Sequence, residues 1–447
     1  ERVAVEDVDL PRIPVQPMGW GAAREILERM GGGEAPEAWR GGLELTYRMG
    51  GDDAVRVALA VEQRRALMKT ANVIGTLRGT RPDAPEIVFG AHHDAWEYGA
   101  HDPTAGTILV LEAARVFGEM AQRGMRPERT VRFACWGAEE YGIFGSSEWV
   151  EANEERLRGN ALAYVNADAS TFGMNFRAGA TPPLHEVLRL SAEDVYRAML
   201  MEGDAEIEGE DARIPTFGFG DLGGGSDHVG FLCHAGVPSA SVGSSGARGS
   251  AYHSSYDNLR WYRQTVGDDY EPAALLTRIV GLFIARLANA DLAPLDPSAM
   301  VADAARRLDE IETEAEEAGL DAEFAWARAV ADAWVEASGR AYAEARARME
   351  RGEMGEEELA AWERAAVALP RLWLMDEGLP ERAWFRNTFA APDENSGYAA
   401  WVLPWLRRAV EMESQAELDA ATAALEEVMR RHLDALRFEA AAQEGAE

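Results

Sequence analysis

The chain has 447 residues, of which 47% are hydrophobic, and its 44 Lys and Arg against 77 Asp and Glu give a formal net charge of -33. This length and apolar content predict a globular protein of about two or three domains, and the negative charge argues against nucleic acid or an anionic membrane surface as a partner. Because no apolar run approaches the roughly twenty residues that span a bilayer, we expect no membrane segment in this chain.

The first part of the chain differs in character from the rest. Residues 1–50 are rich in Pro, Gly and polar side chains and contain one short helical pattern at 21–30, so we expect a lead-in or the remnant of another domain. Apolar strands then alternate with amphipathic helices. Strands are predicted at 55–61, 71–77, 86–91, 129–137, 161–168 and 236–243, and helices at 105–124, 142–158 and 182–199. This alternation predicts an α/β domain over 51–294, with a mixed, largely parallel sheet flanked by helices.

The pattern changes again after the Pro-containing stretch "ADLAPLDPSA". Strand signals stop there, and helices rich in Ala, Glu and Arg continue to the end of the chain. Their apolar stripes and acidic outer faces are typical of a helical bundle. We therefore expect an all-α domain over 295–447.

Side chains that bind metal ions gather where the predicted strands end. The candidates are His92, Asp94, Asp102, Glu139, Glu140, Asp168, Tyr252 and His253. In an open α/β sheet, ligands bind at the carboxyl ends of the strands, so we expect these groups to meet. Two imidazoles with hard carboxylate oxygens suit Zn²⁺ at a catalytic site, whereas the two cysteines, Cys135 and Cys233, are too few for a thiolate site.

The adjacent carboxylates Glu139 and Glu140 favour more than one metal ion. In a buried loop the pair is costly unless cations neutralise it. Two ions about 3.5 to 4 Å apart that share one carboxylate would neutralise it and hold a hydroxide nucleophile. Taken singly, each candidate also has an ordinary structural interpretation, such as a loop hydrogen bond, a helix N-cap or a solvated surface charge. Their joint occurrence in one α/β pattern favours the metal site.

Several motifs resemble a known family. The stretches "HHDAWEYGAHDPTAG", "WGAEEYGIFGSSEW", "AYVNADAS", "GGGSDH" and "YHSSYDN" closely resemble the co-catalytic zinc exopeptidases of the glutamate carboxypeptidase II and transferrin receptor group. Near the end, "EGLPERAWFRNTFAAPDENSGYAAWVLP" resembles the dimerisation domain of that group. The resemblance implies a zinc-exopeptidase (phosphorylase/hydrolase-like) fold, an all-α dimerisation bundle and a homodimer. Residues 1–50 would then be the remnant of a protease-associated, apical domain.

The resemblance also implies the metal ligands, two Zn²⁺ per subunit. His92 and Asp168 would hold one ion, Glu140 and His253 would hold the other, and Asp102 would bridge them. The family favours a cis peptide bond between the bridging aspartate and the proline that comes after it, so we expect one here.

The same resemblance assigns catalytic roles. Glu139 would be the general base that takes a proton from the bridging water and passes it to the leaving amine. Tyr252 would donate its hydroxyl to the oxyanion, and Asp94 would orient the imidazole of His92.

Three further residues are substrate-binding candidates by resemblance: Ser226, Arg386 and Tyr398. Arg386, or with less support Arg248, would receive a C-terminal carboxylate. The arginines with which glutamate-cleaving members hold acidic side chains are replaced, by Ser241 and Gly243. A glutamate bound there would bury an unpaired carboxylate, so the sequence argues against acidic substrates.

The leading hypothesis is a dinuclear zinc exopeptidase of the carboxypeptidase or dipeptidase type, which hydrolyses short peptides through a bridging hydroxide. A zinc aminopeptidase and a non-catalytic, receptor-like homologue stay open as alternatives. Family members carry an apical domain and a further piece of catalytic domain before the stretch "LPRIPVQP", so we expect a fragment or a lineage without that insert. An extracellular or periplasmic location is expected from the family, although this chain shows no signal segment, and a cytoplasmic location stays open.

Overall fold

The computed structural model describes residues 13–51, 55–62, 64, 66–202 and 214–444. It contains two compact units, Glu1–Lys69 and Thr70–Glu447. The first unit contains helix α1 (Trp20–Leu27) and the short 3-10 helix η2 (Glu37–Trp39), and no residue of α1 is buried. The predicted strand at 55–61 is wrong, because the described residues there pair with no other strand. An alternating sequence becomes a strand only where its backbone groups find partners.

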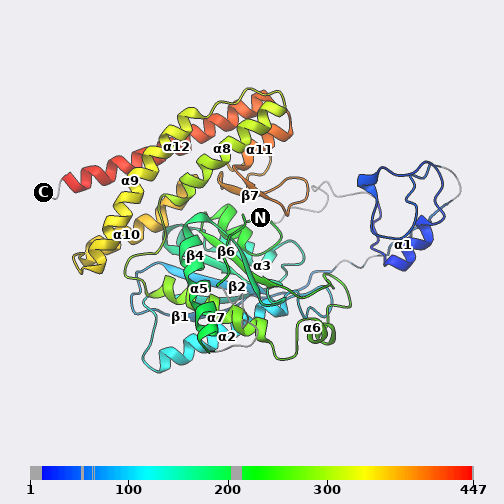
Figure 1. Ribbon diagram of the computed structural model, residues 1–447, viewed down its shortest axis with the longest axis horizontal. Coiled ribbons are helices and arrows are strands. Elements are labelled where there is room, and N and C mark those ends of the chain that lie inside the picture. The colour runs from blue at the N-terminus through cyan, green and yellow to red at the C-terminus, as the bar shows by residue number, and fades with distance from the viewer. Residues whose placement is uncertain (1–12, 52–54, 63, 65, 203–213, 445–447) are drawn as a thin grey trace. The chain divides into compact units, whose positions relative to one another are not determined.

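A six-stranded sheet forms the centre of the second unit, in the order β1-β3-β2-β4-β6-β5 (Figure 1). The strands are β1 (Val73–Leu77), β2 (Glu86–His92), β3 (Val131–Trp136), β4 (Ala161–Asn166), β5 (Asn175–Ala180) and β6 (Ser239–Ser245). The four central strands run parallel, and the edge strands β1 and β5 run antiparallel to their neighbours. The mixed, largely parallel sheet is therefore confirmed. The sequence pattern does not predict β5, because only Phe176 and Ala180 on this strand are buried.

Helices cover both faces of this sheet. On β2, Ile87 and Phe89 face helices α2 (Thr104–Gln122), α5 (His185–Glu202) and α7 (Glu271–Asn289). Val88 points to the opposite face, where α3 (Phe144–Ala152), α4 (Glu154–Asn160) and the single π-helical turn η4 (Gly230–His234) pack. Because both faces are covered, every residue of β2 is buried, which explains its continuous apolar run. The predicted helix at 142–158 is two helices, which meet at Asn153, where φ is -122°.

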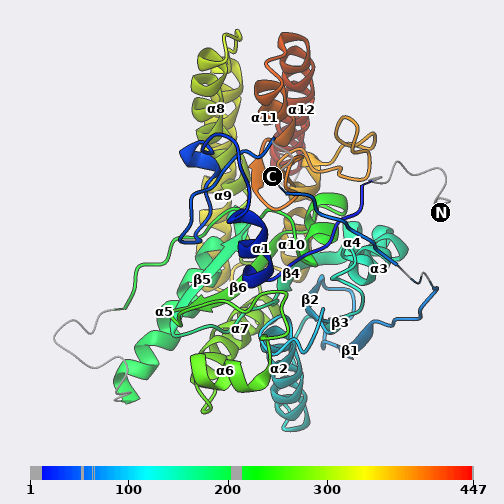
Figure 2. The same ribbon diagram turned by 90° about the vertical axis from the view of Figure 1, so that its right-hand side faces the viewer.

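The last part of the second unit is helical. It consists of α8 (Ala299–Glu317), α9 (Ala325–Glu350), α10 (Glu356–Ala368), the 3-10 helix η5 (Leu369–Trp373), α11 (Pro404–Glu411) and α12 (Gln415–Glu444). Helix α9 packs against both α8 and α12 (Figures 1 and 2). Buried aromatic side chains, including Trp334 and Trp373, fill the core between these helices. The predicted helical bundle is confirmed, with the addition of a small sheet of β7 (Ala390–Pro392) and β8 (Ala400–Val402).

The helical part shares its core with the α/β part. Leu222, Leu232 and Cys233 pack in the same cluster as the aromatic residues of the helices. The domain boundaries at residues 50 and 294 stay predictions: the two compact units divide between Lys69 and Thr70, and the α/β and helical parts lie within one unit. Across the described ranges, none of the helices combines the length and the apolar character needed to cross a bilayer.

Candidate active site

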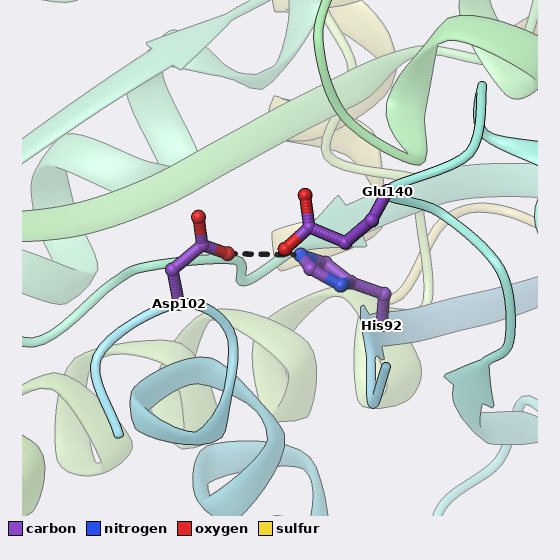
Figure 3. Close-up of side chains that lie close together, drawn as sticks. All are labelled: His92, Asp102 and Glu140. Carbon is purple, nitrogen blue, oxygen red and sulfur yellow. Dashed lines mark ion pairs between the residues drawn. The ribbon is translucent and has the colours of Figure 1, made fainter. Parts of the chain in front are cut away.

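The metal-binding side chains predicted from the sequence meet at the carboxyl ends of the parallel strands. His92 is the last residue of β2, Glu140 lies in the turn after β3, and Asp102 precedes α2 (Figure 3). Ligand atoms of these three side chains all lie within 4.8 Å of one another. The cluster is therefore compact enough to hold a metal ion.

Two imidazoles approach Asp102 from different sides. Nε2 of His92 lies 3.4 Å from Oδ1 of Asp102 and 2.9 Å from Oδ1 of Asp168. Nε2 of His253 lies 3.2 Å from the other oxygen of Asp102, Oδ2, and 3.1 Å from Oε2 of Glu140. Each oxygen of Asp102 thus belongs to a separate set of one imidazole and one further carboxylate. This is the arrangement expected of a carboxylate that two metal ions share.

The electrostatics of the cluster fit a bound cation. Burial raises the pKa of Glu139 to about 9, with Asp227 and Asp168 adding to this and His92 opposing it. Burial and the charge of Asp102 raise the pKa of Glu140 to about 7. Oε1 of Glu140 is buried and has no hydrogen-bond partner among the described residues. A divalent ion would neutralise these carboxylates, and the imidazole and carboxylate donors suit such an ion.

The pKa of His92 also shows that the surrounding carboxylates favour a positive charge at this place. Burial lowers the pKa of His92, but the carboxylates of Asp102, Asp168 and Asp94 outweigh burial and raise the pKa well above its usual range. The carboxylates therefore attract positive charge to the place where Nε2 points, which is what a metal site requires.

Asp94 orients three of the other candidates with different atoms. Its backbone carbonyl accepts a hydrogen bond from Nδ1 of His92 at 3.0 Å, which leaves Nε2 to face the metal site. Its carboxylate accepts hydrogen bonds from the backbone N–H groups of Glu139, at 3.0 Å, and Glu140, at 3.2 Å. The carboxylate lies 3.7 Å from the imidazole, too far for a hydrogen bond. Asp94 thus holds His92 through its main chain and the paired glutamates through its side chain.

The loop that carries Asp102 is fixed by a residue that the sequence analysis missed. Asp257 is buried, and its two oxygens accept hydrogen bonds from the backbone N–H groups of His101, at 2.8 Å, and Asp102, at 3.0 Å. The peptide bond between Asp102 and Pro103 is cis, as the resemblance implies. The only signal for Asp257 in the sequence is its place in the motif "YHSSYDN".

A cavity of about 670 Å³ opens over the cluster. All five candidate metal ligands line it, as do Glu139 and three further candidates, Ser226, Tyr252 and Tyr398. Burial and the adjacent hydroxyl of Tyr398 raise the pKa of Tyr252, so its hydroxyl keeps its proton at neutral pH. Arg386 lies outside the cavity, because its guanidinium pairs with Glu154 on α4. The structure does not bring Arg386 to the site.

Part of the cavity wall comes from the helical part of the chain. The backbone N–H of Gly224 donates to the carbonyl of Tyr398 at 3.1 Å. A Cβ at Gly224 would lie 1.8 Å from the carbonyl oxygen of Gly397, so this approach needs a glycine. The glycine-rich stretch at 223–225 therefore serves to seat the loop that carries Tyr398 against the cavity.

Arg177 is a cavity residue that the sequence analysis also missed. It lies on β5, paired in register with Gly243 of β6, and a Cβ at Gly243 would lie 3.7 Å from its Nε. Its side chain is exposed and makes no hydrogen bond or ion pair with the part of the chain that the structure describes. A cation therefore stands beside Gly243, in the cavity that Ser241 also lines, where the sequence predicted none and on a strand that the pattern does not reveal.

Comparisons with known proteins match both parts of the second unit. Residues 72–273 match the model of peptidase family M28, and residues 302–437 match that of the transferrin receptor-like dimerisation domain. The probable glutamate carboxypeptidase LAMP1 of Arabidopsis thaliana is 33% identical over 258 residues, which are 56% of this chain and 36% of that protein. Aminopeptidase NAALADL1 of Mus musculus is 28% identical over 312 residues, 64% of this chain and 42% of that protein. The chain thus spans less than half the length of these relatives.

Among solved structures, a zinc aminopeptidase from Bacillus subtilis superposes with a TM-score of 0.39 at 20% identity, covering 49% of this chain and 50% of the other.

Proposed function

We propose, from the membership of this chain in the glutamate carboxypeptidase II and transferrin receptor group, that it is a zinc-dependent exopeptidase acting on short peptides. The chain belongs to that group because it joins a family M28 peptidase domain to a transferrin receptor-like dimerisation domain. The observation that carries the proposal is the convergence of two imidazoles and two carboxylates on the two oxygens of Asp102. The names of its relatives, a probable glutamate carboxypeptidase and an aminopeptidase, both fall within the exopeptidases.

We assign two zinc ions to the site. His92 and Asp168 would hold one, Glu140 and His253 would hold the other, and Asp102 would contribute one oxygen to each. When bound, the ions would polarise the scissile carbonyl and lower the pKa of the attacking water.

Glu139 is positioned to move the proton. Its Oε2 lies 3.9 Å from Nε2 of His92, so the carboxyl borders the cluster, and the backbone of the same residue is held by Asp94. In its ionised form, which cations bound at the cluster would favour, the carboxylate would accept a proton from the attacking water and return it to the leaving amine.

We propose that Tyr252 stabilises the developing oxyanion. Its ring stacks on that of His253, with centroids 3.7 Å apart, on the wall of the cavity. Because its pKa is raised, the hydroxyl stays protonated and donates to the carbonyl oxygen as charge develops there.

The charges in the cavity favour a substrate with a free C-terminal carboxylate. Arg177 offers a cation to it without giving up another partner among the described residues. An aminopeptidase would instead need a carboxylate for the substrate amine. Apart from the metal ligands and Glu139, the one cavity carboxylate in the described ranges is Asp221, and both of its oxygens already accept from Arg307, at 2.6 and 2.8 Å. We therefore prefer the carboxypeptidase or dipeptidase type, with aminopeptidase activity as the second candidate on the similarity to NAALADL1.

The test is digestion of a peptide library by zinc-loaded protein, followed by a comparison of N-acetylated dipeptides with aminoacyl anilides. We expect the blocked dipeptides to be cleaved. Replacing Arg177 with alanine should lower kcat/KM for them about 10- to 100-fold, since a charged hydrogen bond contributes about 1.5 to 3 kcal/mol. Arg197→Ala, on the exposed face of α5, is the control and should change nothing.

Two results would contradict this assignment. Cleavage of the anilides alone, unaffected by Arg177→Ala, would establish the aminopeptidase candidate. Cleavage of neither class by zinc-loaded protein would favour a non-catalytic, receptor-like homologue.

We also propose that the protein is a homodimer through residues 302–437, on the strength of the dimerisation-domain match. Light scattering at micromolar concentration should give twice the chain mass, and a stable monomer would contradict the proposal.

A further inference from the structure

A buried chain of hydrogen bonds runs beneath the metal cluster and ends on Asp168. Nε1 of Trp136 donates to the hydroxyl oxygen of Tyr164 at 3.0 Å, and that hydroxyl donates to Oδ1 of Asn166 at 2.9 Å. Nδ2 of Asn166 donates to Oγ of Ser226 at 2.8 Å, and Ser226 donates to Oδ2 of Asp168 at 2.6 Å. The first three side chains have no exposed surface, so water cannot replace these bonds.

The donor and acceptor types of these groups give the chain of hydrogen bonds a single direction. An indole N–H only donates and an ionised carboxylate only accepts, whereas hydroxyl and amide groups do both. With Trp136 at one end and Asp168 at the other, the arrangement that gives every one of these groups a partner points each intermediate bond toward Asp168. The hydroxyl of Tyr164 thereby fixes which way the amide of Asn166 faces, and the amide fixes Ser226 as a donor to the carboxylate. Bonds aligned in this way polarise one another.

A glycine in the middle of β2 makes room for this chain of hydrogen bonds. A Cβ at Gly90 would lie 2.4 Å from Nε1 of Trp136 and 2.9 Å from the hydroxyl oxygen of Tyr164. Glycine weakens a strand interior and is typically found there where another group must approach closely. The ring of Tyr164 is also held flat against Phe231, with centroids 3.8 Å apart and an angle of 2° between the planes. The position of the tyrosine hydroxyl is therefore fixed from both sides.

We propose that Tyr164, supported by Trp136, is a positioning residue for the metal ligand Asp168 and acts on it through Asn166 and Ser226. The proposal rests on the proposed function, since it requires zinc at Asp168. Hydrogen bonds behind a ligand set its orientation and basicity. The bond from Ser226 to Oδ2 keeps Oδ1 turned toward His92, from which it lies 2.9 Å.

Loss of the tyrosine hydroxyl removes this control. In Tyr164→Phe, Oδ1 of Asn166 loses its donor, and the amide is free to turn over and present that oxygen to Ser226. The serine hydroxyl then donates to the amide instead of to Asp168, and the ligand loses the bond to Oδ2 while the backbone N–H of Ala169 still donates to Oδ1 at 2.6 Å.

The experiment measures zinc affinity by competition with a chelator. We expect Tyr164→Phe to bind zinc about 10- to 100-fold more weakly than the unmodified protein, the range found for residues behind a ligand. Trp136→Phe should give a smaller loss, since Tyr164 still donates to Asn166, and it serves as the second variant if Tyr164→Phe does not fold.

Tyr196→Phe is the matched control. Its hydroxyl, in the same α/β part, accepts from the backbone N–H of Phe176 at 3.1 Å and donates to the carbonyl of Met174 at 2.6 Å. Removing it deletes two hydrogen bonds of a mostly buried tyrosine but touches nothing near the metal. The thermal stability of Tyr196→Phe should fall, as that of Tyr164→Phe does, with no change in zinc affinity.

A double-mutant cycle with Ser226→Ala shows whether Tyr164 acts on Asp168 through this series of hydrogen bonds. If it does, adding Tyr164→Phe to Ser226→Ala weakens zinc binding no further. Equal effects in both backgrounds, or a Tyr164→Phe variant that binds zinc as tightly as Tyr196→Phe, would overturn the proposal while leaving the proposed function intact. Failure of the unmodified protein to bind zinc would overturn both.

Discussion

Replacing Glu139 with glutamine removes an ionisable group from the candidate active site and changes its shape very little. The side chain is only 7% exposed and borders the metal cluster. Its backbone N–H, which Asp94 holds, is unaffected. The variant therefore separates the proton-transfer role of Glu139 from the metal-binding role of its neighbours.

The size of the effect on stability can be worked out from the pKa. In the metal-free protein, burial raises the pKa of Glu139 from an ordinary 4.5 to about 9. Between these values the folded state keeps a proton that the unfolded state has lost, so the free energy of unfolding falls as the pH rises. At pH 7 this amounts to about 3 kcal/mol. Metal-free Glu139→Gln should therefore be more stable than the unmodified protein by up to about 3 kcal/mol at pH 7, with no difference below pH 4.5.

Urea unfolding of both metal-free proteins at several pH values tests the stability, and steady-state kinetics with zinc-loaded protein tests the catalytic role. We expect kcat to fall by about 100- to 10,000-fold, the usual contribution of a general base, while the zinc content is unchanged. Equal stabilities at all pH values would refute the buried, protonated carboxyl, and retained turnover would refute Glu139 as the base.

Two further predictions concern the cavity wall and the helical part. Gly224→Ala would place a methyl group 1.8 Å from the carbonyl oxygen of Gly397. We therefore expect kcat/KM to fall at least about tenfold with zinc still bound, and the free energy of unfolding to fall by about 1 to 3 kcal/mol. Gly218→Ala is the control, because nothing lies within 4 Å of a Cβ there, and it should behave like the unmodified protein, whereas a fully active Gly224→Ala would contradict the role of this contact. His432 is buried on α12, and burial lowers its pKa from 6.5 to about 4. Below pH 6.5 the unfolded state therefore takes up a proton that the folded state does not, so stability should fall by about 3 kcal/mol by pH 4, and urea unfolding of His432→Phe should show less of this acid loss. An identical acid loss in both proteins would show that His432 does not stay neutral when folded.

The sequence predicts the strands that are buried on both faces. β2 and β4 are continuous apolar runs with every residue buried, so their local sequence alone identifies them. β5 escapes prediction because its stability comes from pairing with β6, and a partner is not visible in a local pattern. The stretch at 55–61 shows the converse: it alternates as a strand should but has no partner in the described ranges.

In the metal site, too, some residues are predictable from the sequence and others are not. Its ligands are predictable because they lie just after strand ends at positions that the motifs mark, and chemistry limits which residue types can serve. The residues that hold these ligands in place or complete the cavity are not predictable in this way. Asp257 holds the loop of Asp102 from 155 residues away, and Arg177 reaches the cavity from a strand that the pattern does not reveal. Trp136 reads as an ordinary core aromatic until its hydrogen bond to Tyr164 is known.

The most direct test of the metal-site assignment is a crystal structure of the protein grown with zinc, with anomalous data collected on both sides of the zinc absorption edge. The assignment predicts two anomalous peaks, one between His92 and Asp168 and the other between Glu140 and His253, with an oxygen of Asp102 bound at each. Zinc bound elsewhere, or a cluster in which Asp102 contacts neither ion, would contradict it.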